Sequence, residues 1–368
     1  MKRFLFTLLS ISVIANFIFA QDIEEDVVTS SLVDSNKITN PLYVIDGEDI
    51  IDDATTSLGD AIDSYLGVSI ADYAATVGQP IIRGMSGPRV KILKNGMVNR
   101  DVSGLGVDHL NDIDLNDFQQ IEIVKGPSSL LYANGTTGGI INVVDNAIAT
   151  MDIEEPLINV GLESQSVNSG DTHNINAKSN INGLNLTFGY KNSEFGNYDV
   201  PNGAVIHEEE EEDEEEEENL GYINNSDLQV ESSKFGLSKT GDWGFIGFSI
   251  DNLESVYGIP FHGEEHEPEG EGEAEPHGEE RIFSTTDSES FSIKGSYNIN
   301  GSLINSITYN FRDSDYSLTE GHEEEHDEDE PHDPDEADEP TVFMHDAIEY
   351  GEIFDLCTEK ITQQISLH

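Results

Sequence analysis

The residues of this chain that are best suited to chemistry are histidines embedded in three strongly acidic segments. Imidazole is a good ligand for zinc, copper and nickel, and carboxylates can complete the coordination shell and raise the local cation concentration. Calcium, by contrast, prefers oxygen ligands alone. Seven of the 11 histidines fall in these segments: His207, His262, His266, His277, His322, His326 and His332. Their placement predicts a site for a divalent transition metal, with zinc as the favoured ion.

Two pairs of these histidines are spaced four residues apart. His262 and His266, like His322 and His326, would present both imidazoles on one face if a helical turn formed on binding. The second pair also fits the H-E-x-x-H pattern of zinc proteases. That motif needs a buried amphipathic helix, and no apolar residue occurs between His322 and Pro331. We therefore interpret the match as a product of the abundance of Glu and His, and we predict no enzyme.

Composition also points to cations. The 368 residues include 74 Asp and Glu against 17 Lys and Arg, a formal net charge of -57, which argues against nucleic acid as a partner. A run of acidic residues is usually a solvated, disordered segment. In this chain the acidic runs also contain histidines, which favours metal capture. The single cysteine, Cys357, excludes an internal disulfide framework and a cysteine-based zinc site.

The N-terminus has the pattern of a secretory signal peptide over residues 1–20. Lys2 and Arg3 precede an apolar run from Phe4 to Phe19, and Ala20 is a small residue before the expected cleavage point. No later apolar run is long enough for a transmembrane helix. Any membrane-spanning part must therefore consist of β-strands.

Residues 41–149 have the pattern of one α/β domain. A strand is expected at 42–45, and the apolar spacing at 56–65 predicts an amphipathic helix. The run 90–96 is a strand that ends in an Asn-Gly turn. Two further apolar runs, at the ends of 121–144, flank a connection rich in glycine, which predicts a tight and shaped loop.

Residues 150–368 alternate between apolar and polar side chains, which is typical of transmembrane β-strands. Tight turns are expected at 182–183, 240–242 and 300–301. They alternate with long loops at about 192–227, 253–288 and 314–346, and these loops hold the acidic histidine segments. Since short turns of outer-membrane barrels face the periplasm, all three long loops are expected outside the cell.

The glycine-rich segment and its neighbours resemble the plug domain of TonB-dependent outer-membrane receptors. The matching residues are Arg83, Gly84, Arg89, Asn95, Gly96, Glu122, Lys125, Gly126, Pro127, Leu131, Tyr132, Gly138, Gly139 and Asn142. Lys125 and Ala133 depart from the family pattern, which usually has arginine and glycine there. The resemblance implies an α+β plug domain followed by an antiparallel transmembrane β-barrel, with the plug residues in structural roles.

The resemblance extends to both sides of the plug. Within the polar stretch 21–40, Glu25 and the four residues Asp26, Val27, Val28 and Thr29 resemble the TonB box, which pairs with the energising protein in the periplasm. Further along, the sequence is similar to zinc-type (ZnuD-like) receptors, in which a Gly-Ile-Pro element opens into an outer loop rich in His and Glu. Because 258–260 is such an element, the resemblance supports His262 and His266 best.

We therefore predict an outer-membrane importer of a divalent metal in a Gram-negative bacterium. It is expected to act as a monomer with the TonB complex and outer-membrane lipid as partners, and with no cofactor beyond the transported ion. A receptor for nickel, copper, a metal chelate or a siderophore remains open, as does a surface protein that binds metal without transport. About eight strands are expected where the family barrel has twenty-two, which predicts a truncated chain or an inactive fragment.

Overall fold

A computed structural model describes residues 42–47, 57–73, 77–106, 109–202, 204, 221–260, 281–323 and 340–356. The chain divides into two units, Met1–Ser30 and Ser31–His368. All described residues belong to the second unit, which contains a small mixed sheet and a large antiparallel sheet. The small sheet and its connections are called the plug, and the large sheet is called the wall.

The plug is built on a five-stranded sheet of order β1-β6-β7-β4-β5. Strand β4 pairs in parallel with β7, and the other neighbours are antiparallel. The strands are β1 (Leu42–Asp46), β4 (Val90–Lys94), β5 (Met97–Val98), β6 (Phe118–Lys125) and β7 (Gly139–Asp145). The strands predicted at 42–45, at 90–96 with its closing Asn-Gly turn, and at both ends of 121–144 are thus confirmed.

The core of the plug lies on this sheet. The central strands β6 and β7 are buried along nearly their whole length, which explains their almost continuous apolar sequence. A separate hairpin, β2 (Val68–Tyr73) with β3 (Val77–Ile82), contributes further to the core. The largest cluster of buried apolar residues includes Ile45, Leu58, Ile62, Ile82, Ile92, Phe118, Ile121, Ile123, Ile141 and Val143.

The helix predicted at 56–65 is wrong in type. Its described part contains only a 3₁₀ helix, η2 (Asp60–Ile62), followed by further turns in which Tyr65 donates to the Ile62 carbonyl. The Ser57 hydroxyl and the Asp60 carboxylate bond to each other at 2.9 Å and start the turn, and Gly67, at φ +76°, ends it. Leu58, Ala61 and Ile62 are buried, so the apolar spacing identified the core face correctly. Among the described residues no helix is long and apolar enough to cross a membrane.

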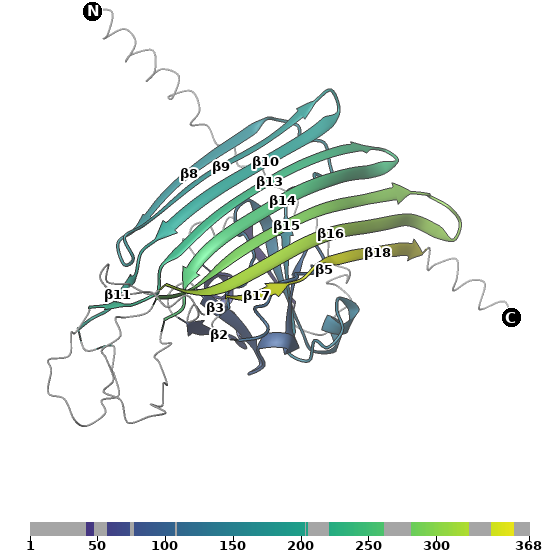
Figure 1. Ribbon diagram of the computed structural model, residues 1–368. Coiled ribbons are helices and arrows are strands. Elements are labelled where there is room, and N and C mark those ends of the chain that lie inside the picture. Colours follow the sequence, from purple (N-terminus) through teal and green to yellow (C-terminus); the bar gives the residue numbers. More distant parts are fainter. Residues whose placement is uncertain are drawn as a thin grey trace, which may run out of the picture. The chain divides into compact units, whose positions relative to one another are not determined.

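The wall is a nine-stranded antiparallel sheet of order β17-β16-β15-β14-β13-β10-β9-β8, in which β18 also pairs with β16 (Figure 1). Its strands are β8 (Leu157–Gln165), β9 (Gly170–Ile181), β10 (Leu184–Phe195), β13 (Leu228–Gly241), β14 (Gly244–Gly258), β15 (Arg281–Asn298), β16 (Ile304–Glu323), β17 (Thr341–Met344) and β18 (Ala347–Leu356). A minor pair, β11 (Tyr198–Asp199) with β12 (Tyr222–Ile223), lies apart from it.

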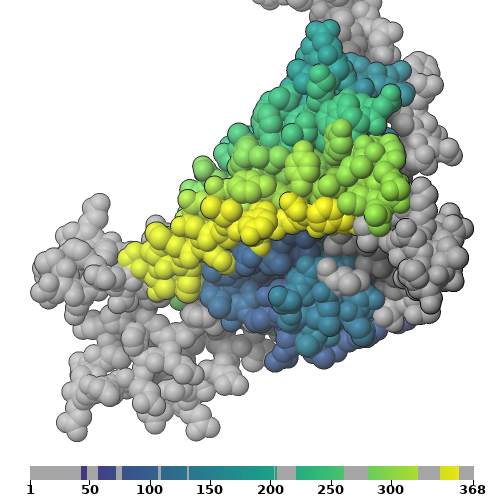
Figure 2. Space-filling model, turned by 90° about the vertical axis from the view of Figure 1, so that its right-hand side faces the viewer, coloured from purple at the N-terminus to yellow at the C-terminus, as the bar shows by residue number. Residues whose placement is uncertain are grey.

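Strands β17 and β18 pair with successive parts of β16, so the nine strands occupy eight positions across the sheet. This agrees with the expected number of about eight. Figure 2 shows these two strands in yellow along one border of the sheet, and β8 forms the other border. Within the described ranges the sheet is therefore open and does not close into a barrel.

Turns lie at or beside the three predicted places: at 182–183 as expected, at 242–243 where 240–242 is expected, and at 299–303 around the expected 300–301. At the first one Asn182 and Gly183 have φ values of +55° and +78°, which a type I′ hairpin requires. The strands, however, are longer than predicted, so the long connections shorten to 196–227, 259–280 and 324–340. The reason is that ladder hydrogen bonds need no apolar side chains, and polar strand ends such as 313–323 stay paired with a neighbour.

Candidate functional site

The two faces of the wall differ in chemistry because successive side chains of a strand point to opposite faces. On the outer face Phe235, Ile250 and Phe291 are partners in register and all are exposed. The other exposed large apolar side chains of the wall include Ile158, Val160, Leu162, Ile175, Phe188, Ile246, Tyr297, Ile348 and Tyr350. An exposed apolar face of this kind is the pattern of strands that face lipid.

The inner face contacts the plug and is polar. Across β13, β14, β15 and β16, successive inward rows join residues that are partners in register. From the end with the long connections these rows read Leu228–Tyr257–Ser284–Glu320, Val230–Ser255–Thr286–Leu318, Ser232–Leu253–Ser288–Tyr316, Lys234–Asp251–Ser290–Ser314 and Gly236–Ser249–Ser292–Arg312. Every inward position of β15 in these rows carries a hydroxyl.

At the top row a plug histidine meets a wall carboxylate. His109 Nδ1 lies 3.5 Å from Glu320 Oε1, and the ring packs edge-on against Phe343 at 6.2 Å between centroids. His109 is only 7% exposed, and its Nδ1 forms no hydrogen bond with any described residue. An imidazole nitrogen and a carboxylate oxygen at this separation are two groups that can bind a divalent cation together.

Next to this pair the plug holds two buried carboxyls, Asp101 and Asp112. Asp101 accepts hydrogen bonds from the Asn99 amide at 2.8 Å and from the Ser103 hydroxyl at 2.6 Å. The Asp112 carboxylate accepts none among the described residues, although the Tyr316 hydroxyl lies beside it. Burial, reinforced by the charge of Asp101, raises the pKa of Asp112 well above its usual range. This carboxyl is therefore held where a proton or a cation would stabilise it.

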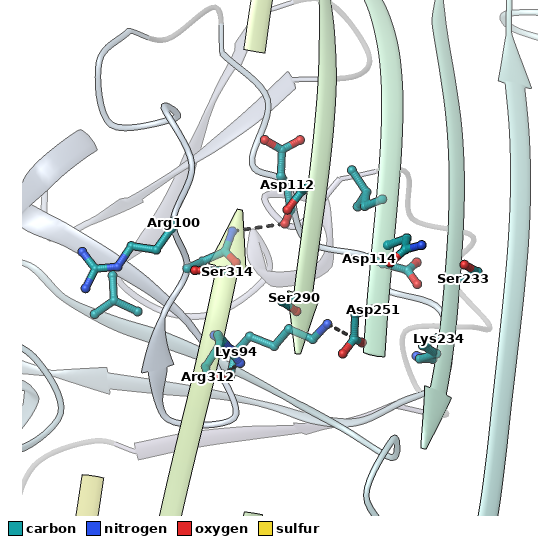
Figure 3. Close-up of a pocket in the computed structure, with 15 residues that line it drawn as sticks. Lys94, Arg100, Asp112, Asp114, Ser233, Lys234, Asp251, Ser290, Arg312 and Ser314 are labelled. Atoms are coloured by element: carbon teal, nitrogen blue, oxygen red, sulfur yellow. Dashed lines mark hydrogen bonds and ion pairs between the residues drawn. The ribbon is translucent and has the colours of Figure 1, made fainter. Parts of the chain in front are cut away.

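Three rows below the top row, the plug is joined to the wall by ion pairs (Figure 3). Lys94 Nζ lies 2.8 Å from Asp251 Oδ1 on the wall and 3.6 Å from Asp145 Oδ2 on the plug. The Arg312 guanidinium donates to the Lys94 carbonyl at 2.8 Å, and Arg100 pairs with Glu349. Burial alone would lower the pKa of Lys94, but Asp251 and Asp145 outweigh it and raise the pKa.

A second joint between plug and wall lies at the turn before β6. The Lys234 ammonium donates to the carbonyls of Asn116 and Asp117, and Lys178 pairs with the Asp117 carboxylate at 3.0 Å. The side-chain amides of Asn116 and Asn176 bond to each other in both directions, at 2.8 and 3.1 Å. Asp117 has a φ of +50°, so the turn is held in a conformation that side chains rarely adopt.

The predicted metal ligands lie almost entirely outside the described residues. This holds for His207, His262, His266, His277, His326 and His332, and for the TonB-box residues Asp26, Val27, Val28 and Thr29. His322 belongs to β16, opposite Ile282, so its backbone is extended. A helical turn from His322 to His326 would require the end of this strand to refold. No group of three or more metal-binding side chains is present in the part of the chain that the structure describes.

The predicted plug residues lie in the plug, and several of them determine the conformation of its backbone. Arg83 and Gly84, with φ values of +53° and +74°, turn the chain after β3. Gly126, with a φ of +76°, begins the 3₁₀ helix η4 (Gly126–Leu131), and Pro127 follows it in the first turn. A Cβ on Gly139 would approach the Val124 carbonyl to 2.6 Å, so only glycine fits there.

Three further plug residues pack or bond within the same sheet. The Asn142 amide accepts from the Gly96 nitrogen at 2.8 Å and donates to the buried Glu122 carboxylate at 3.0 Å. Tyr132 packs on a cluster in β4, β6 and β7. A Cβ on Gly138 would press on Val90 and Met85 at 3.0 to 3.1 Å. All these contacts fit the structural roles that the resemblance implies.

Sequence reasoning missed the residues that join plug and wall, above all His109, Lys94, Asp251 and Glu320. His109 stands alone in a polar stretch, and nothing in its neighbourhood marks it as a ligand. Asp251 could have been identified from the sequence. It is a charged residue that alternates along its strand with the apolar residues Phe248 and Ile250, which point to the opposite face. A charge on the face opposite the lipid needs a partner inside.

Comparison with known proteins identifies the first part of the chain. Residues 34–140 match the family described as TonB-dependent Receptor Plug Domain. The chain is 23% identical over 192 residues to the vitamin B12 transporter BtuB of Vibrio vulnificus, a match that covers 49% of this chain and 30% of that protein. It therefore spans well under two thirds of this relative.

Solved structures resemble the chain over a larger part of its length. The copper transporter OprC superposes with a TM-score of 0.58 at 14% identity, covering 76% of this chain and 38% of OprC. The ferric enterobactin receptor PfeA superposes with a TM-score of 0.56 at 13% identity, covering 86% of this chain and 45% of PfeA. At such identities the likeness concerns the fold alone. Residues 34–140 thus match a TonB-dependent receptor plug domain, and together with the adjoining wall they resemble these transporters and receptors in fold.

Proposed function

We propose that this chain acts in a TonB-dependent outer-membrane receptor that imports a divalent transition metal, with zinc as the favoured ion. One observation carries the proposal. The long connections 196–227, 259–280 and 324–340 all leave the wall at the same end, because tight turns join the strands at the other end. The histidines predicted as ligands lie in these connections or, for His322, at the strand end beside one.

The apolar outer face of the wall supports a position in the outer membrane. In that orientation the tight turns face the periplasm and the acidic histidine segments face outside. Histidines and carboxylates there would capture the ion weakly and raise its concentration at the mouth. The segment Asp26–Thr29 would then couple the plug to the energising complex in the periplasm, so that the plug rearranges and the ion passes. No covalent chemistry is involved.

The pair His109 and Glu320 is the internal acceptor in this proposal. It lies at the top row of the inner face, nearest to the long connections, and joins plug to wall at 3.5 Å. The Asp112 carboxyl adds negative charge near this pair, although the three side chains do not form one metal-binding group among the described residues. An ion bound there would lie between the moving and the fixed part, which is where a transported ligand can affect the plug.

Uptake of radioactive zinc at scarce supply tests the role of the outer histidines. In cells that carry His262, His266, His322 and His326 all changed to Ala, we expect uptake to fall severalfold because the capturing ligands are lost. The matched control is His173→Ala, an exposed histidine of β9 outside the acidic segments. Uptake equal to that of the wild type would overturn loop capture.

The ion itself is decided by competition. Nickel and copper accept the same ligands, and affinity alone does not select zinc. Uptake of labelled zinc in the presence of each competing ion, and of a chelated metal, separates these alternatives. Capture should weaken as the pH falls through about 6.5, since a protonated imidazole is no longer a ligand. Binding of metal to whole cells without accumulation inside would instead identify a surface metal-binding protein.

A further inference from the structure

The inner face of β15 carries a column of hydroxyls that no contact with the plug explains. Its members, Ser284, Thr286, Ser288, Ser290 and Ser292, occupy five successive inward positions and span roughly 26 Å. The corresponding positions of β14 include Leu253 and Tyr257, so the hydroxyls are a property of this strand and not of the wall as a whole.

A hydroxyl of this column and one directly beside it are buried and have no hydrogen-bond partner among the described residues. Thr286 is 1% exposed, and its register partner Ser255 on β14 is 2% exposed. Neither hydroxyl forms a hydrogen bond with any described residue. Because an unpaired buried hydroxyl costs about 1 to 3 kcal/mol, such groups are retained where water or a ligand satisfies them. These positions between plug and wall can therefore accept hydrogen bonds from water or a ligand.

The column runs from the internal acceptor towards a cavity. Ser284 is the register partner of Glu320, so the column begins beside the His109 and Glu320 pair. Ser288 and Ser290, farther down, line a cavity between the wall and the plug. Lys94 enters this cavity from the plug and ends on Asp251, as Figure 3 shows, and Arg312 holds the Lys94 carbonyl beside it. The lower end of the column is therefore closed by cationic side chains.

We propose that a hydrated cation moves from Glu320 along the hydroxyl column of β15 to Asp251, and that Lys94 closes this route by its ion pair with Asp251. The proposal rests on the proposed import of a cation and adds the residues that line its path. Neutral oxygens bind a hydrated ion weakly enough to release it, and Asp251 supplies a carboxylate beside Ser290, near the lower end of the column. A cation that reaches Asp251 competes with the Lys94 ammonium and so loosens the plug from the wall at this point.

The second joint between plug and wall belongs to a different part of the sheet. The 116–117 turn is bound by Lys178, Asn176 and Lys234 from β9 and β13, next to the strand where the chain passes from plug to wall. It is made largely of hydrogen bonds to backbone and amide groups, which a passing cation does not exchange. We expect this joint to persist while the Lys94 joint opens.

Cysteine accessibility tests the route without metal and without the energising partner. In a Cys357→Ser background, Ser290→Cys is treated with a cationic methanethiosulfonate reagent in membranes. Adding Lys94→Met should raise its reaction rate by about tenfold, because the closing side chain is gone. Lys94→Arg should keep the rate low, and so should the exchanged pair Lys94→Asp with Asp251→Lys. Thr187→Cys, on the wall near the second joint, is the control and should not change.

Each outcome decides one point. Equal rates at Ser290→Cys with and without Lys94→Met would overturn closure by Lys94. Faster reaction at Thr187→Cys as well would mean that the whole plug has loosened, which overturns a route confined to β15. Zinc that protects Thr286→Cys from the reagent would support its use as the cargo. Lack of protection, together with the expected effect of Lys94→Met, would reject zinc as the ion and leave the route in place.

Discussion

Asp251 and Glu254 lie three residues apart on β14, yet they occupy opposite faces of the wall and different environments. The Asp251 side chain is 12% exposed and ends on Lys94 of the plug. Glu254 is exposed and lies in register between two more carboxylates, Glu231 and Asp287. Like charges opposite each other weaken a sheet, although water screens them on an exposed face. The face of the strand, and not the residue type, decides what a charge does here.

The inner face shows the opposite arrangement of charge. Lys178, Lys234 and Arg312 point from the wall to plug carbonyls or carboxylates, while the chain as a whole has a formal net charge of -57. Basic residues are scarce in this sequence, and several of them are used to hold the plug. The two faces therefore differ in chemistry: the outer face exposes apolar side chains and carboxylates, and the inner face attaches the plug.

Breaking the inner ion pair should have the largest effect. Asp251→Ala leaves the Lys94 ammonium largely buried with only the more distant Asp145 as a partner. We expect the plug to lose about 3 kcal/mol of stability against local opening, the cost of breaking a buried pair from one side. Hydrogen exchange of the amides in β4 and β5 measures this loss. Unchanged protection would show that the pair does not hold the plug.

The neighbouring residue tests the outer face. Ile250→Lys places a charge among Phe235 and Phe291, which are partners of Ile250 in register. If this face contacts hydrocarbon, the substitution should cost about 2 kcal/mol of folding stability in lipid. Ile250→Val is the matched control, and urea titration in liposomes gives the difference. A cost near zero would contradict contact of this row with lipid.

Acid should release the plug through Asp145. Burial raises the pKa of this carboxyl, but the charges of Lys94 and Lys234 outweigh burial and lower it to about 2. Because the folded-state pKa is the lower one, the stabilisation is present above the unfolded value of 3.8 and is lost as the pH falls towards 2. It is on the order of 2 kcal/mol. Asp145→Asn should remove this part of the pH dependence of β4 hydrogen exchange.

The smallest effect is expected at Glu254. Glu254→Gln removes an exposed charge between two others of the same sign, so stability should change by less than about 0.5 kcal/mol, and towards a gain. Urea titration in liposomes measures it. A loss of the size expected for Asp251→Ala would mean that the outer carboxylates have partners of their own, and the contrast between the faces would fail.

Local rules made much of the fold predictable. Strands of the wall follow from alternation over ten or more residues, and the turn at Asn182–Gly183 follows from the need for positive φ. The same rules failed between Ser57 and Gly67, where a period typical of a helix is built from 3₁₀ turns. There the side-chain hydrogen bond between Ser57 and Asp60 and the strand that begins at Val68 set the conformation.

The candidate site was less predictable because its contacts join distant parts of the chain. Lys94 and Asp251 are 157 residues apart, and the hydrogen bond between Arg312 and the Lys94 carbonyl spans 218. No local pattern connects such residues. The parallel pairing of β4 with β7 is of the same kind, since it depends on the whole plug sheet.

The sequence by itself determined the local features of this protein: a plug with glycine-dependent turns, strands with one apolar face, and acidic segments in which histidines are concentrated. These features follow from residue type and spacing, which act over a few residues at a time. The tertiary structure alone decided which charges face inward and which of them meet. It placed His109 beside Glu320 and Lys94 on Asp251, because only the packed plug and wall bring buried charges close enough to satisfy one another.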